Sequence, residues 1–149
     1  MSDRIEKCIE IHAPISRVWE ALTDHKKFGE WFRVRLDGPF VPGEMSTGNM
    51  LYPGYEHLKW EAFVKAMEPE RYFAMTWHPY AIDPDQDYTE ETPTLIEFTL
   101  ESTETGTLLR VVESGFDKLP PSRRDEAFRM NEGGWAEQVQ NIKAYVENA

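Results

Sequence analysis

The chain has 149 residues, a length typical of one domain, and a domain of this size buries about 70% of the surface that its unfolded chain exposes. Apolar residues make up 40% and aromatic residues 13% of the sequence, which is enough for a packed core and excludes wholesale disorder. Lys and Arg number 16 against 27 Asp and Glu, and the resulting net charge of -11 excludes nucleic acid as an expected partner, because phosphates would be repelled.

The sequence favours a cytoplasmic location. Its one cysteine, Cys8, has no second cysteine with which to form an internal disulfide, and the N-terminal residues lack the apolar stretch of a signal peptide. There is no run of about 18 apolar residues, so no membrane span is predicted. We therefore expect a single domain over residues 1–149, without a membrane-spanning helix.

The first predicted elements are a strand and two short helices. Residues 4–12 alternate between isoleucine and mostly polar side chains, which predicts a strand with one face on a core. Pro14 suits the first position of a helix, and apolar residues at helical spacing predict that this helix runs over about 14–24. A second helical turn is predicted over 26–32, where aromatic residues recur at the same spacing.

The middle of the chain is typical of antiparallel strands. Residues 34–55 are rich in glycine and proline, which predicts short strands and turns. Two hairpins are predicted after them, the first from strands 58–65 and 72–77 and the second from strands 94–101 and 107–116. Because no helix intervenes between these strands, they indicate an antiparallel sheet and, with the terminal helices, a fold of the α+β class.

The last predicted element is one long amphipathic helix. It is expected to begin at Ser122, with that residue as its N-cap and Asp125 three residues on, and to end at about Glu147. Its apolar stripe consists of Trp135, Val139, Ile142 and Val146. Gly133 and Gly134 each cost about 1 kcal/mol relative to alanine, which predicts a bend, a close backbone approach or a break between two helices.

No metal site is predicted. Asp83, Asp85 and Asp87 alternate as in a calcium loop, but Tyr88 takes the place of the glycine at the sharp turn and Thr94 that of the closing glutamate. A solvated acidic loop is therefore favoured. The four histidines also lack the spacing of a helical metal-binding pair.

Two titratable residues are candidates for a polar role in a cavity. His78 lies at a predicted strand end, where an acid or base role competes with the more frequent case of an ordinary edge histidine. Glu113 lies on a strand with apolar residues on both faces, so its direction is open. Burying this carboxylate without a partner would be costly, so an outward Glu113, or one paired with Arg35 or Arg110, is favoured over an unpaired inward one.

Seven aromatic residues on the predicted apolar faces either fill a core or line a hydrophobic pocket. They are Trp31, Phe32, Trp60, Trp77, Phe98, Phe116 and Trp135. A long helix against a strongly curved sheet leaves volume between the two unless side chains fill it, which favours the pocket.

Several short motifs occur in an order that resembles a known family. They are Ala13-Pro14-x-x-x-Val18-Trp19-x-Ala21-Leu22-Thr23-Asp24, Trp31-Phe32, Thr76-Trp77, Gly106-Thr107-x-Leu109-x-Val111, Gly115-Phe116 and Gly133-Gly134-Trp135. Together they resemble the activator of heat-shock protein 90 ATPase homologue-like family, within the START-like, birch-pollen-allergen-like (SRPBCC) superfamily. The resemblance covers nearly the whole chain. It implies a helix-grip fold, in which a curved antiparallel sheet wraps around a long C-terminal helix and two short helices close one end of a cavity.

The resemblance also implies that Leu109, Val111 and Glu113 face the cavity, which adds them to the predicted cavity residues. The acidic insertion over 81–93 departs from many relatives and is expected to overhang the entrance. The eukaryotic co-chaperones that named the family carry a second, chaperone-binding domain. This chain has no room for such a domain, so a chaperone partner has weak support.

Three functions follow as hypotheses. The first, which we favour, is a binding protein rather than an enzyme, without cofactor or metal, that holds a hydrophobic or aromatic small molecule between the sheet and the final helix; Glu113 and His78 would orient the ligand. The second is an enzyme of polyketide-cyclase or aromatase type, in which Glu113, His78 or Tyr72 transfers protons. The third is an interaction module for a chaperone or another protein, and an exposed sheet face with Leu108 and Val112 would support a homodimer.

Overall fold

The computed structural model describes residues 4–83 and 85–148, and these form one seven-stranded sheet and three α-helices. In chain order the elements are β1 (Arg4–Ile11), α1 (Ile15–Thr23), α2 (His25–Phe32), β2 (Val34–Leu36), β3 (Met45–Met50), β4 (Lys59–Glu68), β5 (Tyr72–Trp77), β6 (Thr94–Ser102), β7 (Thr107–Ser114), the 3₁₀ helix η1 (Phe116–Lys118) and α3 (Pro121–Glu147). All neighbouring strands are antiparallel, in the order β1-β7-β6-β5-β4-β3-β2.

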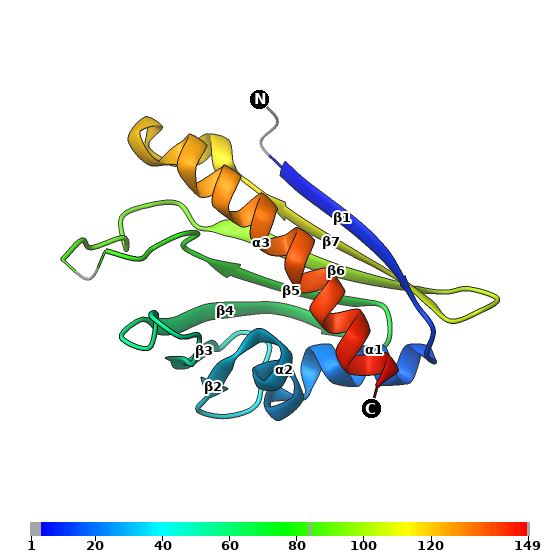
Figure 1. The fold of residues 1–149 in the computed structure, drawn as a ribbon. Helices are drawn as coiled ribbons and strands as arrows, with labels where there is room; N and C mark the ends of the chain where they lie inside the picture. The colour runs from blue at the N-terminus through cyan, green and yellow to red at the C-terminus, as the bar shows by residue number, and fades with distance from the viewer. Residues whose placement is uncertain (1–3, 84, 149) are drawn as a thin grey trace.

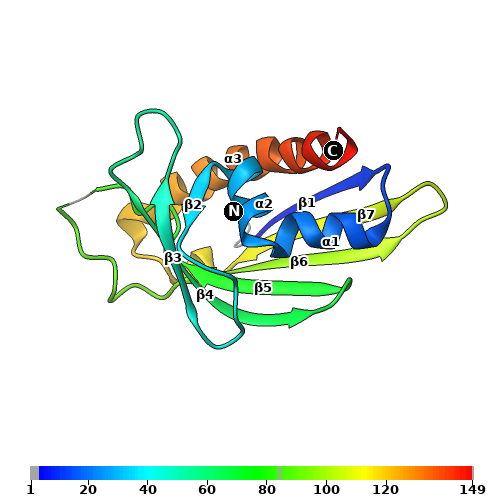
Figure 2. The ribbon, with the colours of Figure 1, turned by 90° about the horizontal axis from the view of Figure 1, so that it is seen from below.

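The sheet curves around the long helix α3, and α1 and α2 lie across one end of the space between them (Figure 1). Figure 2, turned by 90°, shows the two short helices between α3 and the strands at that end. The predicted α+β class and helix-grip arrangement are therefore confirmed. Among the described residues, no helix has both the length and the apolar character needed to cross a membrane.

The N-terminal elements follow from the sequence pattern. Ile5 and Ile11 of β1 are buried while Cys8 is exposed, as the alternation predicts. The side chain of Asp24 accepts hydrogen bonds from the backbone N–H groups of Lys26 and Lys27, at 2.9 and 3.1 Å. These bonds cap α2 and hold the pKa of the Asp24 carboxyl below its ordinary value. The predicted helix boundaries here are correct to within one residue.

The turn before β7 is held against the corner between β1 and α1. A Cβ on Gly106 would lie 2.1 Å from the carbonyl oxygen of Ile11, so only glycine fits this position. The hydroxyl of Thr107, which is fully buried, donates to the carbonyl oxygen of Ala13 at 2.9 Å. The Gly106-Thr107 motif and the Ala13-Pro14 motif are therefore two sides of one contact.

A series of aromatic rings in contact forms the centre of the core. Phe32 packs against Trp60 with ring centroids 5.1 Å apart, and Trp60 packs against Trp77 at 5.7 Å. Trp77 lies over Trp135 of α3 at 6.0 Å, and Trp135 contacts Phe98 of β6 at 5.8 Å. Each such pair contributes about 0.5–1.5 kcal/mol beyond the burial of its surface. The series joins α2, three strands and α3 into one body.

Two expected boundaries near the C-terminus are wrong. The last strand ends at Ser114, because Gly115 adopts a left-handed conformation with φ of 100° and Phe116 starts η1. Helix α3 begins at Pro121, so Ser122 lies inside the helix and does not cap it. The reason is that proline, with its fixed φ and missing N–H, occupies the first helical position.

The glycine pair of α3 neither breaks the helix nor allows a close backbone approach. The helix is continuous from Pro121 to Glu147, and a Cβ on Gly133 or Gly134 would meet nothing within 4 Å. The predicted break and the predicted close approach are both wrong.

The outer face of β7 is less exposed than expected. Val112 is only 6% exposed and Leu108 is half-buried. This face offers less apolar surface for a homodimer than the sequence pattern indicated.

Candidate functional site

Glu113 lies near the end of β7 with no exposed surface. It shares the core face of that strand with Leu109 and Val111, which are also buried, so the inward orientation implied by the family resemblance is confirmed. The alternative pairing with Arg110 is wrong. Because successive side chains of a strand point to opposite faces, Arg110 lies on the outer face, where its Nε is 3.4 Å from Glu6.

Four neutral donors surround the Glu113 carboxylate. The indole Nε1 of Trp135 donates to Oε1 at 2.8 Å, and the indole Nε1 of Trp77 donates to Oε2 at 2.7 Å. The hydroxyl of Thr94 donates to Oε2 at 2.5 Å. The amide Nδ2 of Asn131 lies 3.0 Å from Oε1 and 3.3 Å from Oε2. None of the ion pairs between described residues includes Glu113, so neutral groups alone hold it.

The fold brings these groups together through register and helical spacing. Thr94 pairs directly with Trp77 across β5 and β6, and Glu113 pairs with Ile96 two residues further along β6. Asn131 and Trp135 are four residues apart on α3 and therefore project from one face of that helix. Sequence reasoning missed Thr94 and Asn131. The position of Asn131 one turn before Trp135, on the stripe that faces the sheet, is the signal that could have found it.

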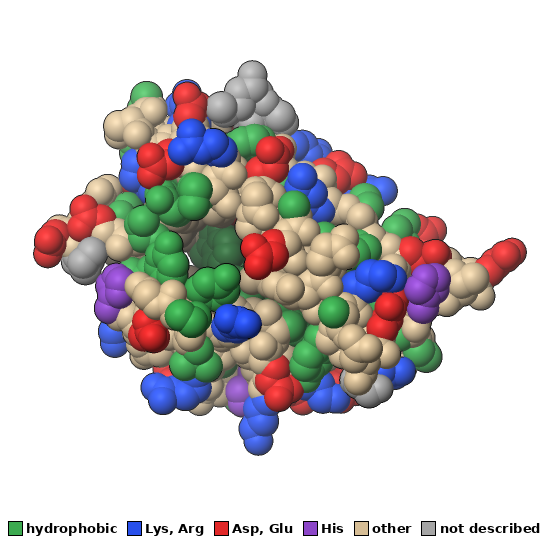
Figure 3. Space-filling model, in the orientation of Figure 1, with side chains coloured by type: hydrophobic (Ala, Val, Ile, Leu, Met, Phe, Trp, Pro, Cys, Tyr) green, Lys and Arg blue, Asp and Glu red, His purple; other side chains and the backbone are tan. Residues whose placement is uncertain are grey.

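Part of the hydrogen-bonded group around Glu113 lies close to the protein surface. Glu113, Thr94 and Trp135 are buried, but Trp77 and Asn131 are half-buried. A movement of the Asn131 amide would open a polar contact to Glu113 without disturbing the two indole N–H groups. Figure 3 shows that the face carrying α3 is hollowed beside that helix, with hydrophobic side chains around and inside the hollow.

The remaining predicted cavity residues are all buried in the core, and two of them also line a surface groove. Trp60, Phe98, Leu109 and Val111 are packed in the core around the indoles. Phe116 is also buried, but it packs against Phe128 at the beginning of α3, with centroids 5.2 Å apart, and makes no hydrogen bond to the site. Trp31 and Phe32 lie on α2. There they line a groove between α2 and α3.

His78 and Tyr72 lie outside the hydrogen-bonded group. His78 follows β5 and is half-buried, and its Nδ1 is buried without a hydrogen-bond partner. Tyr72 alternates with the buried Phe73 on β5 and so projects from the outer face of the sheet, where its hydroxyl donates to Glu97 at 2.5 Å. Burial and this bond to Glu97 raise the pKa of Tyr72 to about 12. A proton-transfer role for Tyr72 inside the cavity is therefore wrong.

We call the acidic insertion over 81–93 the acidic segment, and its described part, together with Pro79 and Tyr80 before it, is fastened to the start of α3 by Arg123. The guanidinium of Arg123 binds both carboxylate oxygens of Glu91, with its closest contact at 2.7 Å, and donates to the carbonyl oxygens of Pro79 and Tyr80 at 2.9 Å each. It also lies 4.6 Å from the ring centroid of Tyr88. Because the side chains of Arg123 and Glu91 are only 13% and 8% exposed, this ion pair is shielded from solvent. Burial raises the pKa of Tyr80, and the nearby Glu126 carboxylate of α3 raises it further.

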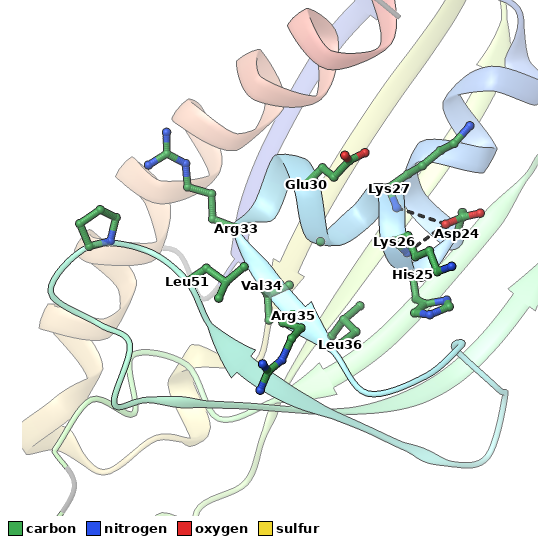
Figure 4. A pocket seen from close by; sticks show the side chains of 12 residues that line it. Asp24, His25, Lys26, Lys27, Glu30, Arg33, Val34, Arg35, Leu36 and Leu51 are labelled. Carbon is green, nitrogen blue, oxygen red and sulfur yellow. Dashed lines mark hydrogen bonds between the residues drawn. The ribbon is translucent and has the colours of Figure 1, made fainter.

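Two grooves border α2. The larger, of about 870 Å³, runs between α2 and the edge strand β2, with Lys26, Arg35 and Leu51 among its lining residues (Figure 4). Arg35 is exposed on this outer side, so the alternative pairing of Arg35 with Glu113 is also wrong. The smaller groove, of about 420 Å³, runs between α2 and α3.

Comparison with known proteins supports the fold. The model of a family described as Activator of Hsp90 ATPase homolog 1-like protein matches residues 12–147. The crystal structure of protein MLL2253 from Mesorhizobium loti is 25% identical, with a TM-score of 0.77 over 98% of each chain. The Aha1 dimer from Colwellia psychrerythraea, solved in solution, is 20% identical, with a TM-score of 0.71 over 97% of this chain and 96% of that one.

A third similar structure is longer than this chain. DynU16, a protein of the dynemicin biosynthetic locus, is 22% identical with a TM-score of 0.75, and the match covers 99% of this chain but 48% of DynU16. At these identities DynU16 and Aha1 support the fold alone. No curated protein matches this sequence significantly.

Proposed function

The chain belongs to the Activator of Hsp90 ATPase homolog 1-like family, and we propose that it binds a small hydrophobic or aromatic molecule beneath α3, at Glu113. The observation that carries the proposal is a fully buried carboxylate held only by neutral donors. Removing a carboxylate from water without a cation costs several kcal/mol, and an apolar core of the same volume would avoid that cost altogether. A role in binding explains why the position is polar.

The surroundings of Glu113 define the ligand's chemistry. The rings of Trp77 and Trp135 are stacked with an interplanar angle of 29°, and they present aromatic surface next to the carboxylate. Asn131 makes the longest hydrogen bonds to Glu113, so a ligand hydroxyl or N–H group is expected to take its place. The ligand is therefore an apolar or aromatic molecule with one hydrogen-bond donor, and the hollow beside α3 is its route of entry (Figure 3).

The similar proteins are consistent with this proposal but do not distinguish it from the other candidate functions. One similar structure comes from a biosynthetic locus and another is described as a dimer of Aha1, and a shared fold does not imply a shared function. A cytoplasmic location and a homodimer remain parts of the proposal. Size-exclusion chromatography with light scattering tests the homodimer, since it separates a mass of 17.4 kDa from twice that value.

Native mass spectrometry tests for the proposed ligand whatever its identity, because a bound molecule adds its own mass to that of the protein. The purified protein is incubated with a small-molecule cell extract, and its native mass is compared with its denatured mass. We expect a defined adduct that Glu113→Gln and Trp135→Phe reduce strongly. Glu132→Gln is the matched control, because Glu132 is an exposed residue of the same helix. An adduct that survives both site variants would show that the ligand binds elsewhere.

An enzyme that transfers protons with Glu113 is the second candidate. It is favoured by the same buried carboxylate and by His78. This histidine directly follows Trp77 in the sequence, and its buried Nδ1 has no hydrogen-bond partner. The two candidates differ in the fate of the ligand. An enzyme releases a molecule of altered structure, whereas a binding protein releases the same molecule that it took up, and mass spectrometry of the released compound distinguishes these outcomes.

A further inference from the structure

We infer a second binding site in the groove between α2 and α3, which takes a planar aromatic molecule that carries an acidic group. The groove has a volume of about 420 Å³, within the range of roughly 300–1,000 Å³ typical of small-molecule sites. Tyr52, from the loop after β3, supplies an exposed aromatic wall, and the largely buried Trp31 and Phe32 of α2 also line the groove. Glu113 does not line it, so the inference does not depend on the proposed function.

The glycine pair of α3 points to this groove. Gly133 and Gly134 both destabilise an uninterrupted helix relative to alanine, and a Cβ on either would meet nothing within 4 Å. Neither is therefore required by packing. The two differ in position, because Gly134 lines the groove and Gly133 does not. The missing side chain at Gly134 keeps the groove open, and this gives a reason for glycine there that the fold does not give.

Arg33 supplies the positive charge of this second site. It follows α2 in a left-handed conformation with φ of 63°, which is strained for a residue other than glycine or asparagine. Its guanidinium lies 5.2 Å from the ring centroid of Tyr52, another lining residue. No carboxylate of the described residues forms an ion pair with Arg33, and the nearby Glu30 accepts a hydrogen bond from Tyr145 instead.

Figure 4 shows the side chain of Arg33 pointing away from Lys26 and Lys27, and to the opposite side of β2 from Arg35. Arg33 also lines the larger groove, but among the residues that line the groove between α2 and α3 it alone carries a positive charge. An aromatic ligand with a sulfonate or carboxylate matches this arrangement, because a guanidinium binds planar anions and stacks with aromatic rings. Two carboxylates also line the groove, Glu137 on the α3 side and Glu30 on the α2 side, and both repel an anion, so the acidic group is directed to Arg33 and the rings to the aromatic walls.

Two fluorescent probes that differ only in an acidic group test this inference. They are 1-anilinonaphthalene-8-sulfonate and its neutral counterpart, N-phenyl-1-naphthylamine. We expect the native protein to bind both saturably and the sulfonate more tightly. Gly134→Leu fills the groove and should weaken both probes about tenfold or more, while Gly133→Leu, its matched control, should leave both unchanged.

Arg33→Asn separates charge from shape, because asparagine tolerates the left-handed conformation. We expect it to weaken the sulfonate probe about tenfold and to leave the neutral probe unchanged. Circular dichroism melts of every variant check that the fold is retained. The inference is overturned if the native protein does not bind the sulfonate probe, if the two glycine variants behave alike, or if Glu113→Gln abolishes probe binding while Gly134→Leu does not. The last result would place the probe at Glu113.

Discussion

Glu113→Gln is the perturbation that most directly tests the hydrogen-bonded group around the buried carboxylate. The glutamine amide must replace one carboxylate oxygen by an NH₂ group. If it replaces Oε2, the Thr94 hydroxyl can rotate to accept, but the Trp77 indole N–H cannot. If it replaces Oε1, the Asn131 amide can flip, but the Trp135 indole N–H cannot. In either case one indole donor is left without an acceptor.

The expected magnitude follows from that count. One buried donor without a partner costs about 1–3 kcal/mol, and the relief of burying a charge offsets part of this loss. We expect Glu113→Gln to lower the free energy of unfolding by about 2 kcal/mol, which shifts a urea midpoint by about 1 M for a protein of this size. Glu113→Leu removes the acceptor of both indole N–H groups and should cost more.

Urea unfolding followed by tryptophan fluorescence measures the effect, with Glu132→Gln as the exposed control on α3. The control should change stability by no more than about 0.5 kcal/mol. A Glu113→Gln protein as stable as the native one, or more stable, would refute the reasoning. It would mean that the cost of burying the charge exceeds the value of its hydrogen bonds.

Three further predictions concern the helices and the acidic segment. Gly133→Ala should raise the free energy of unfolding by up to about 1 kcal/mol, measured by urea unfolding, because its Cβ meets no atom; a loss of stability would show a hidden contact. Arg123→Gln should make the acidic segment more susceptible to limited proteolysis, while the same change at exposed Arg129 should not. Equal cleavage of the two variants would show that the Arg123 contacts do not hold the segment. Burial and Glu30 raise the pKa of Tyr145 from 10.0 to about 12, so its contribution to stability is complete below pH 10 and is lost as the pH rises toward 12. Tyr72 also has a pKa of about 12, so in a phenolate absorbance titration Tyr145→Phe should remove one of two late-titrating phenols, and an unchanged late component would contradict this.

The fold was predictable because its elements have distinct periods. The alternation in β1 fits only a strand and the apolar stripe of α1 fits only a helix, and the bounds of both elements agree with the prediction to within one residue. The direction of Glu113 was not predictable from the pattern of β7. Val112 on the outer face is also buried, so hydrophobicity does not distinguish the two faces of that strand, and only the family resemblance indicated the inward orientation.

The composition of the site was harder to predict than its location. Trp77, Trp135 and Glu113 were expected and lie together, but Thr94 and Asn131 are small polar residues of ordinary appearance. Their role depends on strand register and on helix rotation, which pair residues far apart in the chain. The same applies to Gly134, since only the groove beside it distinguishes it from Gly133.

The most direct test of the central claim uses the indole N–H signals of the five tryptophans in an NMR spectrum. The protein is titrated with the extract fraction that gives the adduct in native mass spectrometry. The account predicts that the signals of Trp77 and Trp135 shift, because their N–H groups bind Glu113, while that of Trp60, which donates to Ser46 at 3.0 Å, stays in place. If the fraction binds and leaves the Trp77 and Trp135 signals unmoved, Glu113 is not the ligand site.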